Sequence, residues 1–408
     1  MTSAPDFTSQ NYYRNPAAAM ETLRRQGPVV EVRFPIIGTV WATTTQALAD
    51  QVLKDTETFT IRSSGGQVAG LRWWMPGIVR TLAASMLSMD EPDHKRLRDI
   101  VDEAFRRRAV IGMEPHIQAL GDRLADELFA QGSPADLVDR YARKLPLSVI
   151  CELLGLPLQD REKFIAWAGS FTRLTGALGF LSLIPNMLAM KRYIERHLET
   201  VRRHGGEGLI AEIVRVEKEG GRISRNEIVS MVFLLLFAGH ETTTHLISGS
   251  VFELLKNPGL RDWLEEDWGR ADLAVEEFLR FITPVQFTKP RYVRRDVELG
   301  GVNVKKGDRI MAMLAAANMD PAANPHPERL DLQRRPNRHI AFGTGIHFCL
   351  GHQLARIEGK CALKSLFRRW PELSLAVDEG EIAWRKRPGL KAIERLPVVV
   401  GDAKAFST

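Results

Sequence analysis

The segment that most restricts the fold of this chain begins at Ser224 and ends at Asn257. Ser224 and Glu227 have the spacing of a capping box, in which two side chains satisfy free backbone groups at the start of a helix. Apolar residues dominate the sequence that follows, which predicts a helix of about 30 residues and about 45 Å. A helix that is apolar nearly all round must be enclosed by other elements. The sequence therefore predicts a central helix that crosses an extensive core.

A polar stretch interrupts this helix midway, at residues 238–243, with the sequence Ala-Gly-His-Glu-Thr-Thr. Gly239 lowers helix propensity and a buried threonine can bond to the preceding turn, so we expect a local bulge with room for a molecule such as dioxygen. Glu241 and Thr242 are neighbours, and a carboxylate beside a hydroxyl can relay protons. Taken alone, the pair is also explained as polar residues on a core helix.

One cysteine lies in a glycine-rich loop, Phe-Gly-Thr-Gly-Ile-His-Phe-Cys-Leu-Gly, at residues 342–351. A helical pattern follows at once, so we expect Cys349 just before or on the first turn of a helix, where the dipole stabilises a thiolate. Glycine lets the backbone turn tightly and approach a flat group. The chemistry alone leaves three roles open: nucleophile, metal ligand or inert buried thiol.

This ten-residue pattern resembles the haem-binding loop of the cytochrome P-450 family, the thiolate-ligated haem monooxygenases. The resemblance implies that Cys349 is the axial ligand of a haem b. Residues 238–243 resemble the family's Ala-Gly-x-Glu-Thr frame, which implies that Ala238 contacts the cofactor and that Glu241 and Thr242 deliver protons. It also implies that three glycines shape the cysteine loop: Gly343, Gly345 and Gly351.

Further matches extend along the chain. His94 and Arg98, four residues apart on a predicted helix, resemble the family's His-x-x-x-Arg. Glu277 and Arg280 resemble its structural Glu-x-x-Arg pair, with Arg329 as the third member of a buried ion network that holds the segment before the cysteine loop. The resemblance assigns the haem propionates to four side chains: His94, Arg98, Arg291 and His347.

The expected architecture is one domain over residues 1–408, because the sequence contains no repeat, low-complexity segment or linker. The resemblance implies a mainly α fold, a triangular helix-rich domain with a small β-sheet region and the haem between the central helix and the cysteine-loop helix. Local signals predict a helix from Asn15 to Gly27, a hairpin of 29–33 with 38–43, and a helix over 46–54.

Apolar residues on irregular segments indicate a pocket for an apolar small molecule. The family places its substrate cover in residues 60–88 and a hinge in 161–204, where we expect the helix to break near Gly176, Gly179 and Pro185. Ordinary helix packing explains the second segment equally well. The candidate pocket residues are Trp73, Trp74, Phe180, Phe237, Val285 and Phe287.

The net charge of +6 raises the question of nucleic-acid binding, but 56 basic residues are dispersed among 50 acidic ones. We expect no nucleic acid as a partner, and we interpret Arg106, Arg107 and Arg108 as a docking patch for an acidic electron-transfer protein. Residues 1–15 show no signal peptide and no apolar run reaches the roughly 20 residues of a membrane span. Three cysteines cannot all pair and their spacing is not that of a disulfide framework, so a reducing compartment fits best and we expect a cytoplasmic protein.

The source of electrons follows from what the sequence lacks. It has no flavin or iron–sulfur signature, so we expect NAD(P)H electrons to arrive through a ferredoxin-like donor and its reductase. Within the haem interpretation, a peroxide-driven or non-oxygenating enzyme is an alternative. Two alternatives belong to other classes of function: a haem sensor without turnover, and a thiol hydrolase that uses Cys349 and His347. Residues two apart on a tight loop are poorly placed for a nucleophile–base bond.

Overall fold

The structure is a computed structural model that describes most of the chain. The residues it describes are 5–34, 37–68, 85–107, 110–160, 163–164, 166–167, 176–220, 223–387 and 389–400. The chain divides into two compact units, the first formed by Met1–Gly70, Glu114–Leu145 and Thr242–Thr408 and the second by Leu71–Met113 and Pro146–Glu241. The expectation of one domain over the whole chain stays a prediction.

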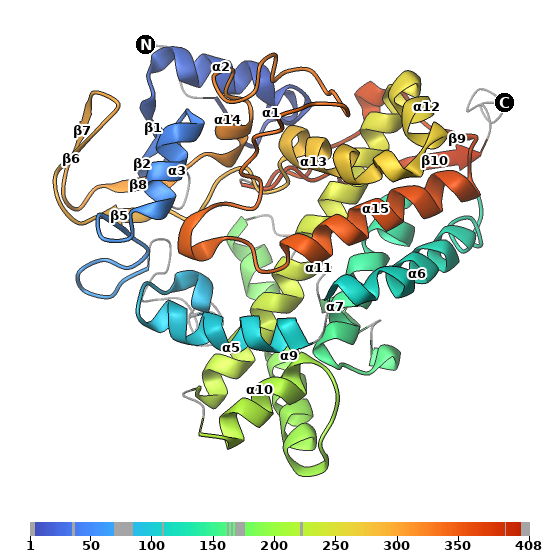
Figure 1. Cartoon of the computed structure of the whole chain (residues 1–408), viewed down its shortest axis with the longest axis horizontal. Helices are drawn as coiled ribbons and strands as arrows, with labels where there is room; N and C mark the ends of the chain where they lie inside the picture. Colours follow the sequence, from blue (N-terminus) through green and yellow to red (C-terminus); the bar gives the residue numbers. More distant parts are fainter. Residues whose placement is uncertain are drawn as a thin grey trace. The chain divides into compact units, whose positions relative to one another are not determined.

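Short strands of the first unit form its sheets. They are β1 (Val29–Phe34), β2 (Gly38–Thr43), β3 (Phe59–Thr60), β4 (Ala135–Asp136), β5 (Arg291–Val293), β6 (Val297–Leu299), β7 (Val302–Val304), β8 (Arg309–Ala312), β9 (Leu373–Leu375) and β10 (Pro397–Val400). A five-stranded sheet has the order β1-β2-β8-β5-β3, a second has the order β4-β10-β9, and β6 pairs with β7 (Figure 1). The predicted hairpin is confirmed, since β1 and β2 pair antiparallel with Val29 opposite Thr43.

Two helices near the N-terminus follow their local signals closely. In α2 (Pro16–Gln26) the side chain of Asn15 accepts a hydrogen bond from the N–H of Ala18 at 3.3 Å, and Gly27 follows the last turn. α3 (Gln46–Lys54) has the predicted bounds. The other helical segments of this unit are α1 (Gln10–Arg14), α6 (Glu114–Asp126), the π-helical turn η3 (Val138–Ala142), α12 (Pro258–Glu266), η5 (Trp268–Arg270), α13 (Ala271–Ile282), α14 (Leu314–Asn318), η6 (Gly345–His347), α15 (His352–Arg369) and η7 (Glu379–Glu381).

The helix that follows the cysteine loop, α15, packs along α6 (Figure 1). A Cβ on Gly121 would lie 2.7 Å from Ser365 Oγ, so glycine permits the close approach of the two helices. Ser365 Oγ donates to Asp122 Oδ1 at 2.6 Å, and the hydroxyl of Tyr141 donates to the carbonyl of Ala362 at 2.7 Å. These contacts, one of them fully buried, hold α15 in place, and the cysteine loop leads directly into that helix.

The second unit is helical in the residues described. Its segments are η1 (Met86–Ser88), α5 (Asp93–Arg107), η2 (Val110–Met113), α7 (Lys144–Leu154), η4 (Leu158–Asp160), α9 (Gly176–His204), α10 (Leu209–Lys218) and the first half of α11 (Arg225–Lys256), which continues into the first unit. Arg202 of α9 and Glu217 of α10 form a bidentate pair, with N–O distances of 2.7 and 3.1 Å. Within the described ranges, no helix has the length and apolar character needed to cross a bilayer.

The predicted capping box and central helix are confirmed in α11. The N–H of Ser224 donates to Glu227 Oε2 at 2.7 Å, and the N–H of Glu227 donates to Ser224 Oγ at 3.3 Å. Arg96 of α5 also donates to Glu227 at 2.6 Å. Burial raises the pKa of Glu227, but the hydrogen bonds from Arg96 and Ser224 outweigh this effect and lower the pKa below its usual value. The start of α11 is therefore fastened within the second unit.

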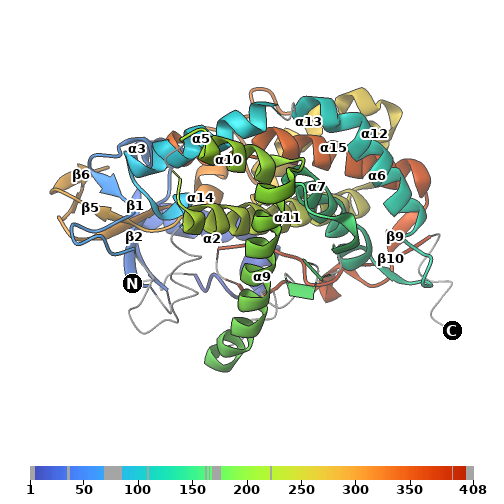
Figure 2. The ribbon, with the colours of Figure 1, turned by 90° about the horizontal axis from the view of Figure 1, so that it is seen from below.

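The breaks expected near Gly179 and Pro185 are wrong. The break expected near Gly176 stays a prediction, because α9 begins at Gly176 and residues 168–175 lie outside the described ranges. The helix continues from Gly176 through Pro185 to His204 (Figure 2). Proline removes one backbone hydrogen bond, yet Met187, Met190 and Ile194 beyond it are buried on one face. Their burial maintains the helix past the proline.

The bulge expected at residues 238–243 is also wrong, because α11 is α-helical from Arg225 to Lys256. A Cβ on Gly239 would lie 3.0 Å from Ile150 Cδ1 of α7, tighter than ordinary contact. Gly239 therefore lets α7 approach α11, and helix–helix packing accounts for the glycine.

Candidate functional site

Cys349 lies in the loop between η6 and α15, two residues before the helix N-cap Gly351. Its backbone N–H donates to the carbonyl of Phe342 at 3.0 Å, which closes the loop on itself. Cys151 and Cys361 are buried, whereas Cys349 is only partly buried. The expected position just before a helix is confirmed, and Cys349 carries the accessible thiol of this chain.

The three loop glycines have different environments. Gly343 and Gly345 have φ angles of 68° and 71°, in the left-handed region that other residues rarely adopt. A Cβ on Gly345 would collide with the carbonyl oxygen of Leu53 at the end of α3, whereas one on Gly343 or Gly351 would have no heavy atom within 4 Å. The loop thus packs against α3 at Gly345 and borders open space at Gly343 and Gly351, which suits the approach of a flat group.

A partly accessible face runs along α11, although most of this helix is buried. Residues 233, 234, 237, 238, 239, 241 and 242 are at least partly accessible, and the spacing of all of them except 239 places them on one side of the helix. Ala238, Glu241 and Thr242 lie on this face beside Phe237. His240 is buried, with Nδ1 2.5 Å from the carbonyl one turn earlier. The structure thus brings the predicted cofactor contact and the acid–alcohol pair onto one face.

Two of the four predicted propionate partners belong to α5 in the second unit. His94 is buried with Nδ1 3.6 Å from Glu91 Oε1, and its pKa is lowered by burial. Arg98 Nε donates to both carboxylate oxygens of Asp102, at 3.0 and 3.1 Å. The two side chains therefore lie about one turn apart on the same helix, and Asp102 holds the guanidinium of Arg98.

The other two predicted partners belong to the first unit. Arg291 is buried at the start of β5 and its Nη1 donates to the carbonyl of Phe59 at 3.3 Å. His347 ends η6, two residues before Cys349, and is partly buried. Arg291 thus presents a buried cation in the sheet, and His347 an imidazole in the cysteine loop.

A buried ion network surrounds Glu277 of α13. Glu277 and Arg280 are fully buried and form a bidentate pair, with N–O distances of 2.7 and 2.8 Å. Arg334 Nε donates to the same carboxylate at 3.1 and 3.2 Å, and Asn337 Nδ2 donates at 3.0 Å. Two guanidinium groups and an amide therefore surround one carboxylate in the core.

Arg329 does not supply the third side chain of this network. Its side chain is 75% exposed, and only its carbonyl oxygen takes part, accepting from Arg280 at 2.9 Å and from Arg334 at 3.1 Å. The segment 329–335 contains three arginines, and sequence spacing does not distinguish which one turns inward. Packing selects Arg334 in place of Arg329.

Asn318 at the end of α14 was missed by sequence reasoning. Its carbonyl accepts from Arg280 at 3.1 Å, its Nδ2 donates to Thr283 Oγ1 at 2.8 Å, and its Oδ1 accepts from the N–H of Ile340 at 2.8 Å. Ile340 precedes Phe342 by two residues. Asn318 thereby connects the Glu277 network to the segment that leads into the cysteine loop.

Glu358 of α15 is a second residue that sequence reasoning missed. It is 1% exposed, and neither carboxyl oxygen has a hydrogen bond of ordinary geometry. Burial raises its pKa well above the usual value, and the hydroxyl of Thr243 on α11 opposes this shift only in part. Burial therefore favours the neutral carboxylic acid over the carboxylate at Glu358, which lies beside Thr243, the residue that follows Thr242.

The predicted pocket residues fall in different environments. Trp73 and Trp74 lie outside the described residues, as does the side chain of Phe180. Phe237 is on the accessible face of α11, and Val285 packs against a core cluster that includes Leu53, Leu314 and Ile340. The ring of Phe287 lies 4.9 Å from that of Phe34 and 6.1 Å from that of Phe7. Phe287 thus belongs at least partly to an aromatic cluster.

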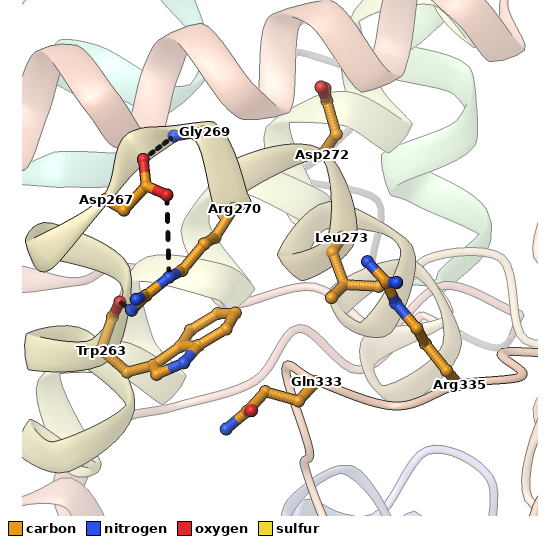
Figure 3. Close-up of a pocket in the computed structure, with 8 residues that line it drawn as sticks. All are labelled: Trp263, Asp267, Gly269, Arg270, Asp272, Leu273, Gln333 and Arg335. Atoms are coloured by element: carbon orange, nitrogen blue, oxygen red, sulfur yellow. Dashed lines mark hydrogen bonds and ion pairs between the residues drawn. The ribbon is translucent and has the colours of Figure 1, made fainter.

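A separate pocket of about 570 Å³ lies at the start of α13 (Figure 3). Arg270 lies over the ring of Trp263 at 4.9 Å and pairs with Glu266 at 3.0 Å, while Arg335 approaches from another segment. None of the predicted site residues lines it. We assign no chemistry to this pocket.

Comparison with known proteins identifies the family. The family model described as Cytochrome P450 (here written P-450) matches residues 187–372. The chain is 38% identical to the vitamin D(3) 25-hydroxylase of Pseudonocardia autotrophica, over 99% of this chain and 98% of that protein. The chain belongs to the cytochrome P-450 family. It is also 33% identical to the 6-deoxyerythronolide B hydroxylase of Saccharopolyspora erythraea, over 98% of this chain and 99% of that one.

Solved structures agree with this assignment. A myxobacterial cytochrome P-450 in complex with myristic acid superposes with a TM-score of 0.87 at 34% identity, covering 98% of this chain and 99% of that one. The predicted mainly α cytochrome P-450 fold is confirmed, and the protein is a cytochrome P-450 monooxygenase. The family implies a haem. A single accessible thiol, in a glycine-rich loop with open space at Gly343 and Gly351, fits that group.

Proposed function

We propose that this cytochrome P-450 inserts one atom of dioxygen into an apolar small molecule, with Cys349 as the axial ligand of haem b. The observation that carries the proposal is the position of the accessible thiol, in a closed loop directly before α15. The N-terminus of that helix favours the thiolate. Haem b, when bound, supplies the activation of dioxygen. Its propionates would be held by His94, Arg98, Arg291 and His347.

The acid–alcohol pair has the chemistry of a proton relay. Glu241 and Thr242 share the partly accessible face of α11, so the carboxylate can take protons from water and the hydroxyl can pass them on. Ala238, one turn earlier on the same face, leaves room beside them because its side chain is a single methyl group. These residues would deliver protons where oxygen is reduced.

The substrate is proposed to be apolar for two reasons. Phe233 and Phe237 add aromatic surface to the accessible face of α11, with ring centroids 4.6 Å apart. Similar proteins are named for, or were crystallised with, largely apolar molecules: vitamin D(3), 6-deoxyerythronolide B and myristic acid. NAD(P)H electrons would reach the protein through a ferredoxin-like donor and its reductase. The side chains of Arg106 and Arg107, and all of Arg108, lie outside the described part of the chain, so their docking role stays a prediction.

Turnover with labelled dioxygen tests this proposal. The purified holoenzyme is supplied with NADPH, a bacterial ferredoxin and its reductase, and a panel that begins with myristic acid and vitamin D(3). We expect mass spectrometry to detect one labelled oxygen atom per product molecule. Equal product from hydrogen peroxide without donor proteins would instead support the peroxide-driven alternative.

Replacing Thr242 by Ala should uncouple electron use from product formation. Without the hydroxyl the relay loses its second member, so we expect roughly tenfold less product per NADPH. This is less than the roughly 10²–10⁴-fold rate contribution of a positioned proton-transfer group, because water can partly replace the hydroxyl. The measurement is the ratio of product formed to NADPH consumed. Thr242→Ser keeps the hydroxyl and should retain most of the coupling. Unchanged coupling in Thr242→Ala would remove Thr242 from proton delivery.

A further inference from the structure

An ion cluster behind the cysteine loop has no role in the function described above. Glu276 of α13 binds Arg356 of α15 in a bidentate pair, with N–O distances of 2.5 and 2.9 Å. His339 Nε2 lies 2.9 Å from the same carboxylate, and the imidazole is 5% exposed. Burial raises the pKa of Glu276, but the hydrogen bonds from Arg356 and His339 outweigh this effect and lower the pKa to about 2. The carboxylate of Glu276 is therefore ionised at every pH at which the protein is handled.

Arg356 contacts the beginning of the cysteine loop. Its guanidinium lies over the ring of Phe342 at 4.6 Å. The carbonyl of Phe342 in turn accepts the backbone N–H of Cys349 at 3.0 Å. His339 supports the same end, because its Nδ1 accepts the N–H of Ala341 at 3.3 Å.

Arg356 also contacts the end of the loop. Its Nη1 lies 2.9 Å from His352 Nδ1 and 3.3 Å from the His352 carbonyl, at the first residue of α15. The ring of His352 is 4.8 Å from that of Phe348, the residue before Cys349. One guanidinium therefore connects both ends of the loop, and Glu276 anchors it to a second helix, α13.

We propose that Arg356, held by Glu276, is a positioning residue that sets the orientation of the Cys349 sulfur by clamping both ends of its loop. The inference rests on the proposed function, in which Cys349 binds the haem iron. Groups behind a metal ligand orient it and tune the metal, and their loss weakens the bond. The clamp needs the planar fork of arginine, since three directions are used at once: the carboxylate, the imidazole and the ring face. Lysine at this position supplies charge without the fork.

The test compares Arg356→Gln and Arg356→Lys with a matched control, Arg261→Lys. Arg261 also pairs with a glutamate, Glu265 at 2.7 Å, and lies over a ring of α15, Phe367 at 4.8 Å. Phe367 lies in the last turn of α15, at the opposite end from the cysteine loop. The reduced holoenzyme is treated with carbon monoxide, and the decay of the thiolate-type absorption band is followed on mild warming. The midpoint potential of the haem is measured in parallel.

We expect the thiolate-type band to decay roughly tenfold faster in Arg356→Gln than in the parent, since losing a charge-assisted hydrogen bond corresponds to about that factor. The decay rate in Arg356→Lys should lie between those of Arg356→Gln and the parent. The potential should rise in Arg356→Gln, because a weakened thiolate bond donates less electron density to iron. Arg261→Lys should match the parent in both measurements.

Three outcomes separate this inference from the proposed function. A parent protein without the thiolate-type band would contradict the function itself. A parent with the band, but with parent-like decay and potential in both Arg356 variants, would overturn the clamp alone. Equal changes in Arg261→Lys and Arg356→Lys would also overturn it, because they would reflect general destabilisation. If Arg356→Gln fails to fold, the decay rate and potential of Arg356→Lys, compared with those of the parent and of Arg261→Lys, decide whether the clamp exists.

Discussion

Replacing Cys349 by Ala is expected to abolish the red-shifted absorption band that the reduced, carbon monoxide-bound protein should display. That band requires a thiolate bound to iron, and alanine has no ligand atom. The loss of the band should be complete. The haem content of the purified protein should fall at least roughly tenfold, because the loss of even a supporting group behind a metal ligand costs about 10–100-fold in affinity. The measurement is the difference spectrum of the reduced protein with and without carbon monoxide.

Cys361→Ala is the matched control for this result. Cys361 lies on α15, in the helix that follows the loop, but it is buried. Burial raises its pKa to about 12, which disfavours the thiolate form that a metal ligand needs. We expect the Cys361 variant to retain the band. A persistent band in Cys349→Ala, or its loss in Cys361→Ala, would assign the iron ligand to another residue.

Replacing Glu277 by Ala should have the largest effect on stability. The change leaves the buried guanidinium groups of Arg280 and Arg334 without their carboxylate. Breaking a buried ion pair by removing one partner costs about 3–5 kcal/mol. We expect the free energy of unfolding, measured by urea titration with far-ultraviolet circular dichroism, to fall by that amount.

Glu21→Ala provides the comparison for Glu277. Glu21 and Arg25 also form an ion pair on a helix, but both side chains are more than half exposed, at 57% and 77%. A surface pair of this kind contributes less than about 1 kcal/mol. Equal losses for the two glutamate variants would mean that the Glu277 network does not hold the core. A matching loss in Arg334→Ala, with little change in Arg329→Ala, would establish which arginine completes it.

Local structure in this protein follows from local sequence. Asn15 caps α2, Ser224 and Glu227 cap α11, and two of the loop glycines, Gly343 and Gly345, adopt left-handed φ angles. Each of these features depends on groups within about four residues of each other, so a short pattern specifies it. The position of Cys349 before α15 and the pairing of Glu277 with Arg280 are also specified by short patterns of this kind.

Partners distant in sequence were decided by the tertiary structure. Arg334 in place of Arg329, the approach of Ile150 to Gly239, and the clamp of Arg356 all join segments that are far apart along the chain. Spacing cannot rank such partners, because several arginines and aromatic rings satisfy the same local pattern. Which of them turns inward depends on how the helices pack, since a buried charge is stable only where the fold supplies its counterion. The sequence alone thus determined the chemical type of the centre and its local frame, and the folded core decided which distant side chains hold that frame in place.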